Sequence, residues 1–194
     1  MEGWSDDALV GRDDLIEELD GVARAAVQGR GSIVLLTGEA GIGKTSVARL
    51  LAQRVRGQFA VSWGMCVADQ SAPPFGPWRP LVALEPPERL NVSDWAIGAP
   101  RLEQLTAFRE TVRVNALEQP RLHVIEDLQW ADVSSVLLLA HLDAIIFGTP
   151  LLVVATLRTG ESIRPELNDA IEAVRRIASV RNLAALESSR RCAA

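Results

Sequence analysis

A glycine-rich segment that ends in a lysine and a threonine holds the residues with the clearest chemistry. It fits the pattern G-x-x-x-x-G-K-[ST] and lies between an apolar run and a helical pattern, which is the context that this motif requires. Glycines let successive backbone N–H groups turn inward, and the free N–H groups at the start of the following helix favour an anion. The segment therefore predicts a loop that binds the phosphates of a nucleotide, with these binding residues: Gly38, Glu39, Ala40, Gly41, Ile42, Gly43, Lys44, Thr45 and Ser46.

Two side chains of this loop have separate tasks. Lys44 is the only lysine beside 19 arginines, and its compact ammonium on a flexible stem can bridge the β- and γ-phosphates. The hydroxyl of Thr45 can ligate Mg²⁺. The alternative is an exposed lysine on a glycine-rich turn. A chance match to the pattern is expected in fewer than about one chain in a hundred of this length, which favours the phosphate loop.

Carboxylates follow a second apolar run, and an arginine follows a third. Residues 121–125 precede Glu126 and Asp127, and residues 151–157 precede Arg158. A nucleoside triphosphatase needs one carboxylate in the metal shell and often a second to polarise water. We therefore expect Glu126 near the metal, Asp127 near the attacking water, and Arg158 within reach of the terminal phosphate. The alternatives are solvated carboxylates at the start of a loop and a surface arginine that caps its strand.

These residues need a scaffold in which strands and helices alternate. Strands that are apolar throughout predict a parallel sheet covered by helices on both faces, a three-layer α/β fold with its ligands at the carboxyl ends of the strands. We expect the chemistry in the loops after Thr37, Ile125 and Leu157, and His123 in the core. The expected strands are 32–37, 59–65, 121–125, 151–157 and 180–186, the expected helices are 12–28, 44–56, 101–118, 132–146 and 165–178, and the expected loops are 69–80 and 85–100.

The composition limits the class of protein. The chain has 194 residues, of which 48% are hydrophobic and 23% charged, and this supports one folded domain. A net charge of -5 argues against a broad phosphate-neutralising surface, so we expect no direct nucleic-acid binding by this segment.

Cys66 and Cys192 are too few for a disulfide framework and indicate reduced thiols in a cytoplasmic protein. The start has no signal-peptide pattern and the apolar stretch 136–147 is too short to span a bilayer, so no membrane association is expected.

Five ordered segments resemble the STAND-type ATPases of the AAA+ superfamily. More narrowly, they look like the ATPase module of large LuxR-type transcriptional regulators and of some cyclase-linked ATPases. The resemblance covers about residues 8–187. The segments are V-G-R-D at 10–13, the phosphate loop at 38–45, W-G-M-C at 63–66 followed by P-P-F-G-P-W at 73–78, E-D-L-Q-W-A-D at 126–132, and A-T-L-R at 155–158.

The resemblance implies an ATP-driven switch that binds ATP and ADP with Mg²⁺, the metal being held by Thr45 and Glu126, and that hydrolyses ATP slowly. With the strands numbered along the chain, it implies the sheet order 5-1-4-3-2. It also implies that Val10, Gly11 and Arg12 border the adenine. Gln129 stands where the family usually has a histidine, and this puts the coupling of the acidic pair to the phosphate in question.

The resemblance also bears on domain organisation. The family continues with a lid that closes over the nucleotide, and usually with repeats and an effector domain. This chain is expected to be the ATPase core alone, with the core at 1–187 and a frayed or truncated tail at 188–194. Because the V-G-R box begins at residue 10, the LuxR-type regulators, whose ATPase module comes first, fit best. Self-association and missing C-terminal effector domains are the expected partners.

Two other functions stay open. A small-molecule P-loop kinase needs an arginine-rich lid, for which Arg101 and Arg109 could serve, although E-D-L-x-W-A-D is not a kinase pattern. A screen for phosphate acceptors separates the two functions. A non-hydrolysing interaction module would bind nucleotide only structurally. A GTPase is nearly excluded, because its guanine-reading N-K-x-D element needs a lysine and the only one lies in the phosphate loop.

Overall fold

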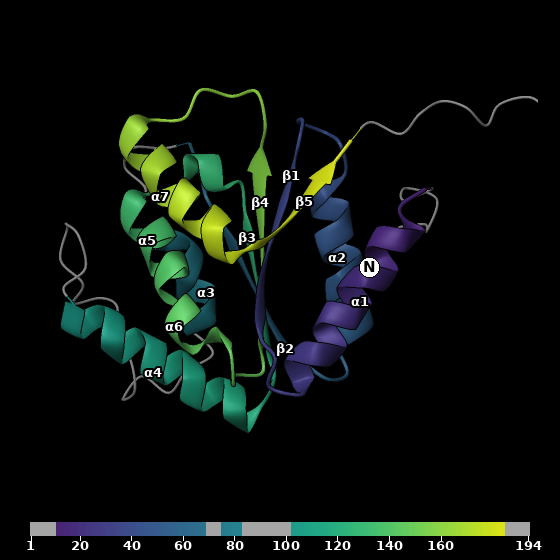
Figure 1. The fold of residues 1–194 in the computed structure, drawn as a ribbon, viewed down its shortest axis with the longest axis vertical. Coiled ribbons are helices and arrows are strands. Elements are labelled where there is room, and N and C mark those ends of the chain that lie inside the picture. The colour runs from purple at the N-terminus through teal and green to yellow at the C-terminus, as the bar shows by residue number, and fades with distance from the viewer. Residues whose placement is uncertain (1–10, 69–74, 83–101, 185–194) are drawn as a thin grey trace, which may run out of the picture.

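A computed structural model describes residues 11–68, 75–82 and 102–184, in which five strands form one parallel sheet (Figure 1). The sheet order is β2-β3-β4-β1-β5, which is the expected order read from the other edge. The last strand ends at Leu183 and not at 186, because its neighbour β1 ends at the paired residue, Gly38. The strands are β1 Ser32–Gly38, β2 Ala60–Met65, β3 Arg121–Glu126, β4 Leu151–Arg158 and β5 Ser179–Leu183.

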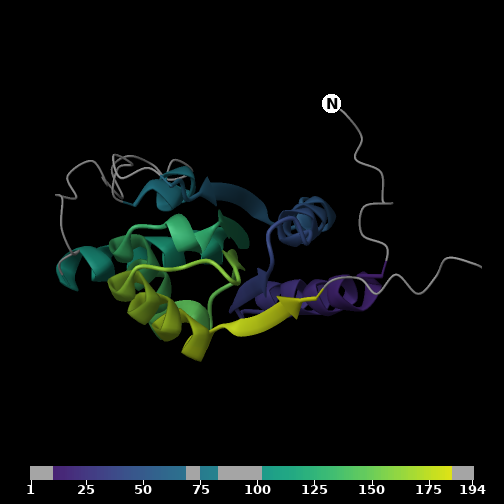
Figure 2. The ribbon, with the colours of Figure 1, turned by 90° about the horizontal axis from the view of Figure 1, so that it is seen from above.

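Helices cover both faces of this sheet (Figures 1 and 2). Successive residues of a strand point to opposite faces, so each strand contributes to two cores. In β1, Val34 and Leu36 face the core that holds α1 and α2, whereas Ile33 and Leu35 face the core that holds α4, α5 and α7. The three-layer α/β fold is thereby confirmed. The long helices are α1 Asp13–Val27, α2 Lys44–Val55, α4 Leu102–Glu118, α5 Val133–His141 and α7 Pro165–Ile177.

The helix expected at 132–146 is divided in two. It consists of α5 and the short α6 Asp143–Ile146. The side chain of Asp132 caps α5, since it accepts hydrogen bonds from the backbone N–H and the hydroxyl of Ser135. At the other end, the N–H of Leu142 bonds the carbonyl of Leu139, three residues earlier, which tightens the last turn and ends α5.

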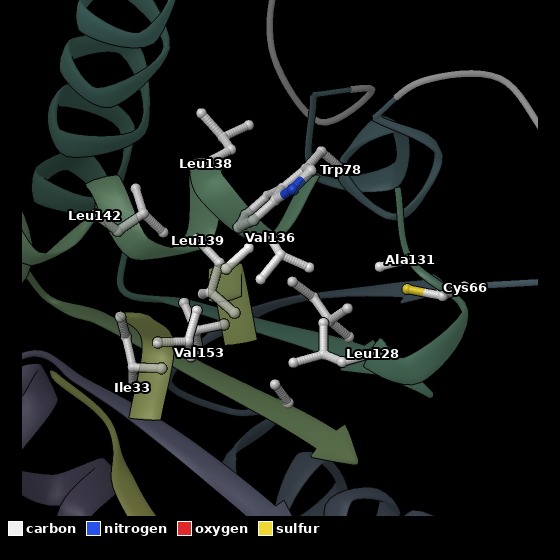
Figure 3. Packing of buried hydrophobic residues seen from close by; sticks show 14 of the residues in the cluster. Ile33, Cys66, Trp78, Leu128, Ala131, Val136, Leu138, Leu139, Leu142 and Val153 are labelled. Atoms are coloured by element: carbon white, nitrogen blue, oxygen red, sulfur yellow. The ribbon is translucent and has the colours of Figure 1, made fainter. Parts of the chain in front are cut away.

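The loop expected at 69–80 is wrong in its second half. A 3-10 helix, η2 Gly76–Trp78, leads directly into α3 Arg79–Val82. The indole of Trp78 is fully buried and lies near Val136 and Leu138 (Figure 3). It donates a hydrogen bond to the carbonyl of Ser135 at 3.0 Å and packs edge-on against Phe108. Gly64 is required beside this segment, because a Cβ there would collide with the backbone of Pro77. Phe75 and Leu81 are buried in the same core, so tertiary packing of this segment overrides the local signal of the prolines.

His123 lies in the core, as expected. Its ring is completely buried in β3, stacks on Trp78 with 5.0 Å between ring centroids, and shares a 2.6 Å hydrogen bond with the hydroxyl of Ser62. Burial is the main reason that the pKa of His123 falls to about 4. Within the described residues, the helices are all too short or too polar to cross a bilayer.

Several expectations fall on residues outside the described part of the chain. They are the adenine-bordering Val10, the first half of the 69–80 loop, the 85–100 loop, Arg101 and the tail at 188–194.

Candidate functional site

The glycine-rich loop joins β1 to α2 and has the backbone that its sequence predicts. Gly41 and Gly43 have φ values of 74° and 99°, in the left-handed region that favours glycine. A Cβ at either position would meet no atom within 4 Å, so it is the backbone conformation and not crowding that favours glycine here. Gly43 is the N-cap of α2 and supplies no side-chain hydrogen bond. The first N–H groups of α2 are thus left for an anion.

Lys44 is buried at the base of this loop. Its ammonium donates hydrogen bonds to the carbonyls of Gly38 and Glu39, at 2.8 and 2.7 Å. Burial lowers the pKa of Lys44, and the positive charge of Arg158 lowers it further, whereas Asp127 and Glu161 act in the opposite direction. Gly38, whose carbonyl this ammonium bonds, is the register partner of Arg158, so the lysine of the phosphate loop lies beside the end of β4. Thr45 and Ser46 follow in the first turn of α2, and both are half-buried.

Glu126 is the last residue of β3 and is only 4% exposed. One carboxylate oxygen, Oε2, accepts a hydrogen bond from the indole N–H of Trp63 in β2 at 3.1 Å. The other, Oε1, is buried without a hydrogen-bond partner among the described residues. A buried carboxylate oxygen without a partner is costly, and a cation or its bound water would satisfy it.

Magnesium fits this arrangement. Mg²⁺ is usually held by one or two protein ligands together with substrate phosphates and water. A hydroxyl from Thr45 and a carboxylate from Glu126 supply that number. The described residues contain no group of three or more His, Cys, Asp or Glu side chains able to hold a metal by themselves.

Asp127 stands in a left-handed backbone conformation, with φ 60° and ψ 54°. Its N–H donates to the hydroxyl of Thr156 in β4, at 2.9 Å. Its two carboxylate oxygens face Arg158, whose Nε and Nη2 donate to Oδ1 and Oδ2 at 3.1 and 3.2 Å. The third donor arm of the guanidinium, Nη1, reaches Glu161 at 3.3 Å. Two carboxylates thus hold the guanidinium.

Gln129 joins the ends of β3 and β4. It lies in the 3-10 turn η4 Leu128–Trp130 and is 5% exposed. Its amide N–H donates to Oδ1 of Asp127 at 3.0 Å, while its amide oxygen accepts the backbone N–H of Arg158 at 3.1 Å. One side chain therefore holds both the carboxylate and the strand end that carries its partner.

A cavity of ≈ 490 Å³ lies beside η4. Trp130, Asp132, Arg79 and Arg164 line it with Gln129, and no residue of the phosphate loop does. Gln129 is the one member of the hydrogen-bonded group around Asp127 that also forms part of this wall.

The structure brings the strand-end residues together, and three other residues named from the sequence lie outside this group. Gly11 and Arg12 precede α1, where a guanidinium N–H of Arg12 donates to the carbonyl of Ala184, just after β5. Arg109 lies on α4 and bonds Thr106 of the same helix, and α4 runs along the end of the sheet where the strands begin (Figure 1). That position is remote from the phosphate loop.

Three contacts of the site were missed in the sequence. Trp63 bonds Glu126, Thr156 bonds the backbone of Asp127, and Glu161 bonds Arg158. Only Glu161 had a local signal, since it follows Arg158 by three residues. The other two contacts join different strands, and their partners are far apart in the sequence.

The fold and the site together define a class. A phosphate loop between the first strand and its helix, with carboxylates at the end of a nearby parallel strand, is the arrangement of P-loop nucleoside triphosphatases. A family model described as "AAA ATPase domain" matches residues 8–154, and the chain belongs to this family of nucleotide-binding domains. The matched residues include the phosphate loop and the acidic pair, and they end before Arg158.

Solved structures agree on the fold. The Aeropyrum pernix ORC2 protein, determined as ADPNP–ADP complexes, superposes with a TM-score of 0.54 at 17% identity, over 94% of this chain and 50% of that one. A structure of Drosophila ORC bound to DNA gives 0.55 at 18% identity, over 91% and 44%. A third, of Drosophila ORC bound to AT-rich DNA and Cdc6, gives 0.53 at 15% identity, over 92% and 58%. The chain thus spans about half the length of these proteins. No curated protein matches it at a significant level.

Proposed function

We propose that this chain is a regulatory switch module that binds ATP and hydrolyses it slowly. The observation that carries the proposal is the meeting of three strand ends around Lys44. The ammonium of Lys44 bonds the carbonyl of Gly38, at the end of β1. Gly38 is the register partner of Arg158 at the end of β4, and Arg158 bonds Asp127, which follows β3. Cation, carboxylate and guanidinium gathered at the carboxyl end of a parallel sheet are the groups that phosphoryl transfer requires.

Each site residue has a role in this proposal. The backbone of residues 38–46 holds the phosphates, and the ammonium of Lys44 moves from the loop carbonyls to the β- and γ-phosphates. Thr45 and Glu126 hold Mg²⁺, which when bound neutralises phosphate charge. Asp127 polarises the attacking water, and Arg158 reports the terminal phosphate. Gly11 and Arg12, with Val10, border the adenine.

The finer assignment follows the motifs. The order of the V-G-R-D, phosphate-loop and E-D-L-Q-W-A-D segments supports a STAND-type module of the kind found in LuxR-type transcriptional regulators. In this proposal residues 1–187 form the ATPase core and residues 188–194 a tail. The ligands are ATP and ADP. Effector domains or further copies of the chain respond to which of the two nucleotides is bound.

Calorimetric titration with ATP, with and without Mg²⁺, tests the proposal. The wild type should bind ATP more tightly when Mg²⁺ is present. Lys44→Ala should weaken binding by about ten- to a hundredfold, since a hydrogen bond to a charged group is worth about 1.5–3 kcal/mol. Arg56→Ala is the matched control, because it removes an exposed cation at the other end of α2. Equal affinity in wild type and Lys44→Ala would refute the phosphate-loop assignment.

A further inference from the structure

The structure pairs two groups that the proposed reaction uses separately. Both carboxylate oxygens of Asp127 accept from Arg158, so its charge is turned toward a cation and not toward a water molecule. The remaining guanidinium nitrogen, Nη1, donates a hydrogen bond to Glu161. While these contacts last, Asp127 cannot serve as a base and Arg158 cannot reach a phosphate.

The ion pair by itself is weak. The side chains of Arg158 and Asp127 are 33% and 28% exposed, and ion pairs in contact with solvent contribute little to stability. Gln129 is different, because it is buried and both ends of its amide are used. It fixes the carboxylate at one end and the backbone of Arg158 at the other. The pairing of Asp127 with Arg158 therefore depends on a neutral amide that is neither acid nor base.

We propose that Gln129 is a positioning residue that clamps Asp127 onto Arg158 until a terminal phosphate draws the guanidinium away. The inference rests on the proposed function and adds its regulation. A terminal phosphate offers Arg158 a doubly charged, bidentate partner. ATP therefore opens the clamp and ADP, which lacks that group, leaves it closed. Part of the binding energy of ATP is used to separate the pair, and Asp127 becomes free only when ATP is present.

Gln129→Met tests the clamp, because methionine keeps the length and the apolar stem but loses both hydrogen bonds. Affinity for the non-hydrolysable analogue AMP-PNP should rise about tenfold, the lower end of the range for one hydrogen bond to a charged group that ATP must otherwise break, while ADP affinity changes less than about twofold. KM for ATP should fall by a similar factor with kcat retained, because saturating ATP has already opened the clamp in the wild type. Gln119→Met, on an exposed residue just before β3 begins, is the matched control and should change neither affinity.

Gln129→Asn provides a second variant if methionine disturbs folding, since its shorter amide cannot span both partners. Thermal unfolding of each variant checks the fold. An equal change in AMP-PNP and ADP affinity, or a fall in kcat at constant KM, overturns the clamp and leaves the proposed switch intact. Absence of ATP binding in the wild type overturns the proposed function, and the clamp with it.

Discussion

Replacing His123 by glutamine is expected to remove most of the acid sensitivity of the central sheet. The imidazole lies in β3 with no exposed surface, between Trp78 and Ser62, and its pKa is lowered from 6.5 to about 4, chiefly by burial. The unfolded chain therefore binds a proton at this site where the folded chain does not. Stability is fully present above pH 6.5 and is lost as the pH falls toward 4.

The size of the effect follows from these two pKa values. Between pH 7 and pH 5 the unfolded state gains a proton on His123 that the folded state does not take up. Integrating that difference gives a loss of about 2 kcal/mol in the free energy of unfolding. The loss levels off below pH 4, where the folded protein becomes protonated as well.

Urea denaturation at pH 7 and pH 5, followed by tryptophan fluorescence, measures this loss. Carboxylates titrate in both proteins, so the difference between wild type and His123→Gln isolates the imidazole. Between pH 7 and pH 5, the free energy of unfolding of the wild type should fall by about 2 kcal/mol more than that of the variant. If both lose the same amount, the imidazole titrates as it does in water, and the argument from burial is refuted.

Three further predictions concern the site and its support. Asp127→Asn should keep Mg·ATP binding but lose most turnover, because it removes a charge that acts mainly in the transition state. Single-turnover hydrolysis measures this loss. If the variant instead loses the dependence of ATP binding on Mg²⁺, Asp127 is a metal ligand. Arg158→Ala should narrow the ratio of ATP to ADP affinity while leaving ADP affinity nearly unchanged, and an equal loss of both in parallel titrations would contradict the sensor role. Gly64→Ala should destabilise the fold by more than about 2 kcal/mol because of its collision with Pro77, whereas Gly57→Ala, with open space around it, should change the urea midpoint little.

Much of the fold could be predicted because its signals are local. Apolar runs between glycines and helical patterns fixed the strands, and the phosphate loop was visible in one continuous segment. The helix at η2 and α3 was not predictable, since four prolines between 73 and 80 favour a loop, and the segment is ordered by burial of Phe75, Trp78 and Leu81 in the core. The break at Leu142 likewise depends on a single tightened turn.

The candidate site divides in the same way. Residues that end strands could be identified from their position alone, and the structure brings Glu126, Asp127 and Arg158 together at the carboxyl ends of the strands. Their partners could not be identified, because a hydrogen bond between Trp63 and Glu126 joins residues 63 positions apart. The hydrogen-bond partner of each carboxylate depends on the order of the strands and on side-chain geometry. A short sequence motif shows neither of these.

The register between β1 and β4 determines on which face of the sheet the charged side chain of Arg158 lies. Gly38 and Arg158 are register partners at the ends of these strands, and the N–H of Thr159 bonds the carbonyl of Gly38 at 3.0 Å. Inserting or deleting one residue inside β4 would turn every following side chain to the opposite face, and the guanidinium would enter an apolar core. The turns where β1 and β4 begin are also held together, since the N–H of Gly148 bonds the carbonyl of Gly29 and a Cβ on Gly31 would collide with the carbonyls of Ile146 and Thr149. This central pair of strands should therefore accept almost no variation in length at either end, and insertions should be confined to connections elsewhere in the fold.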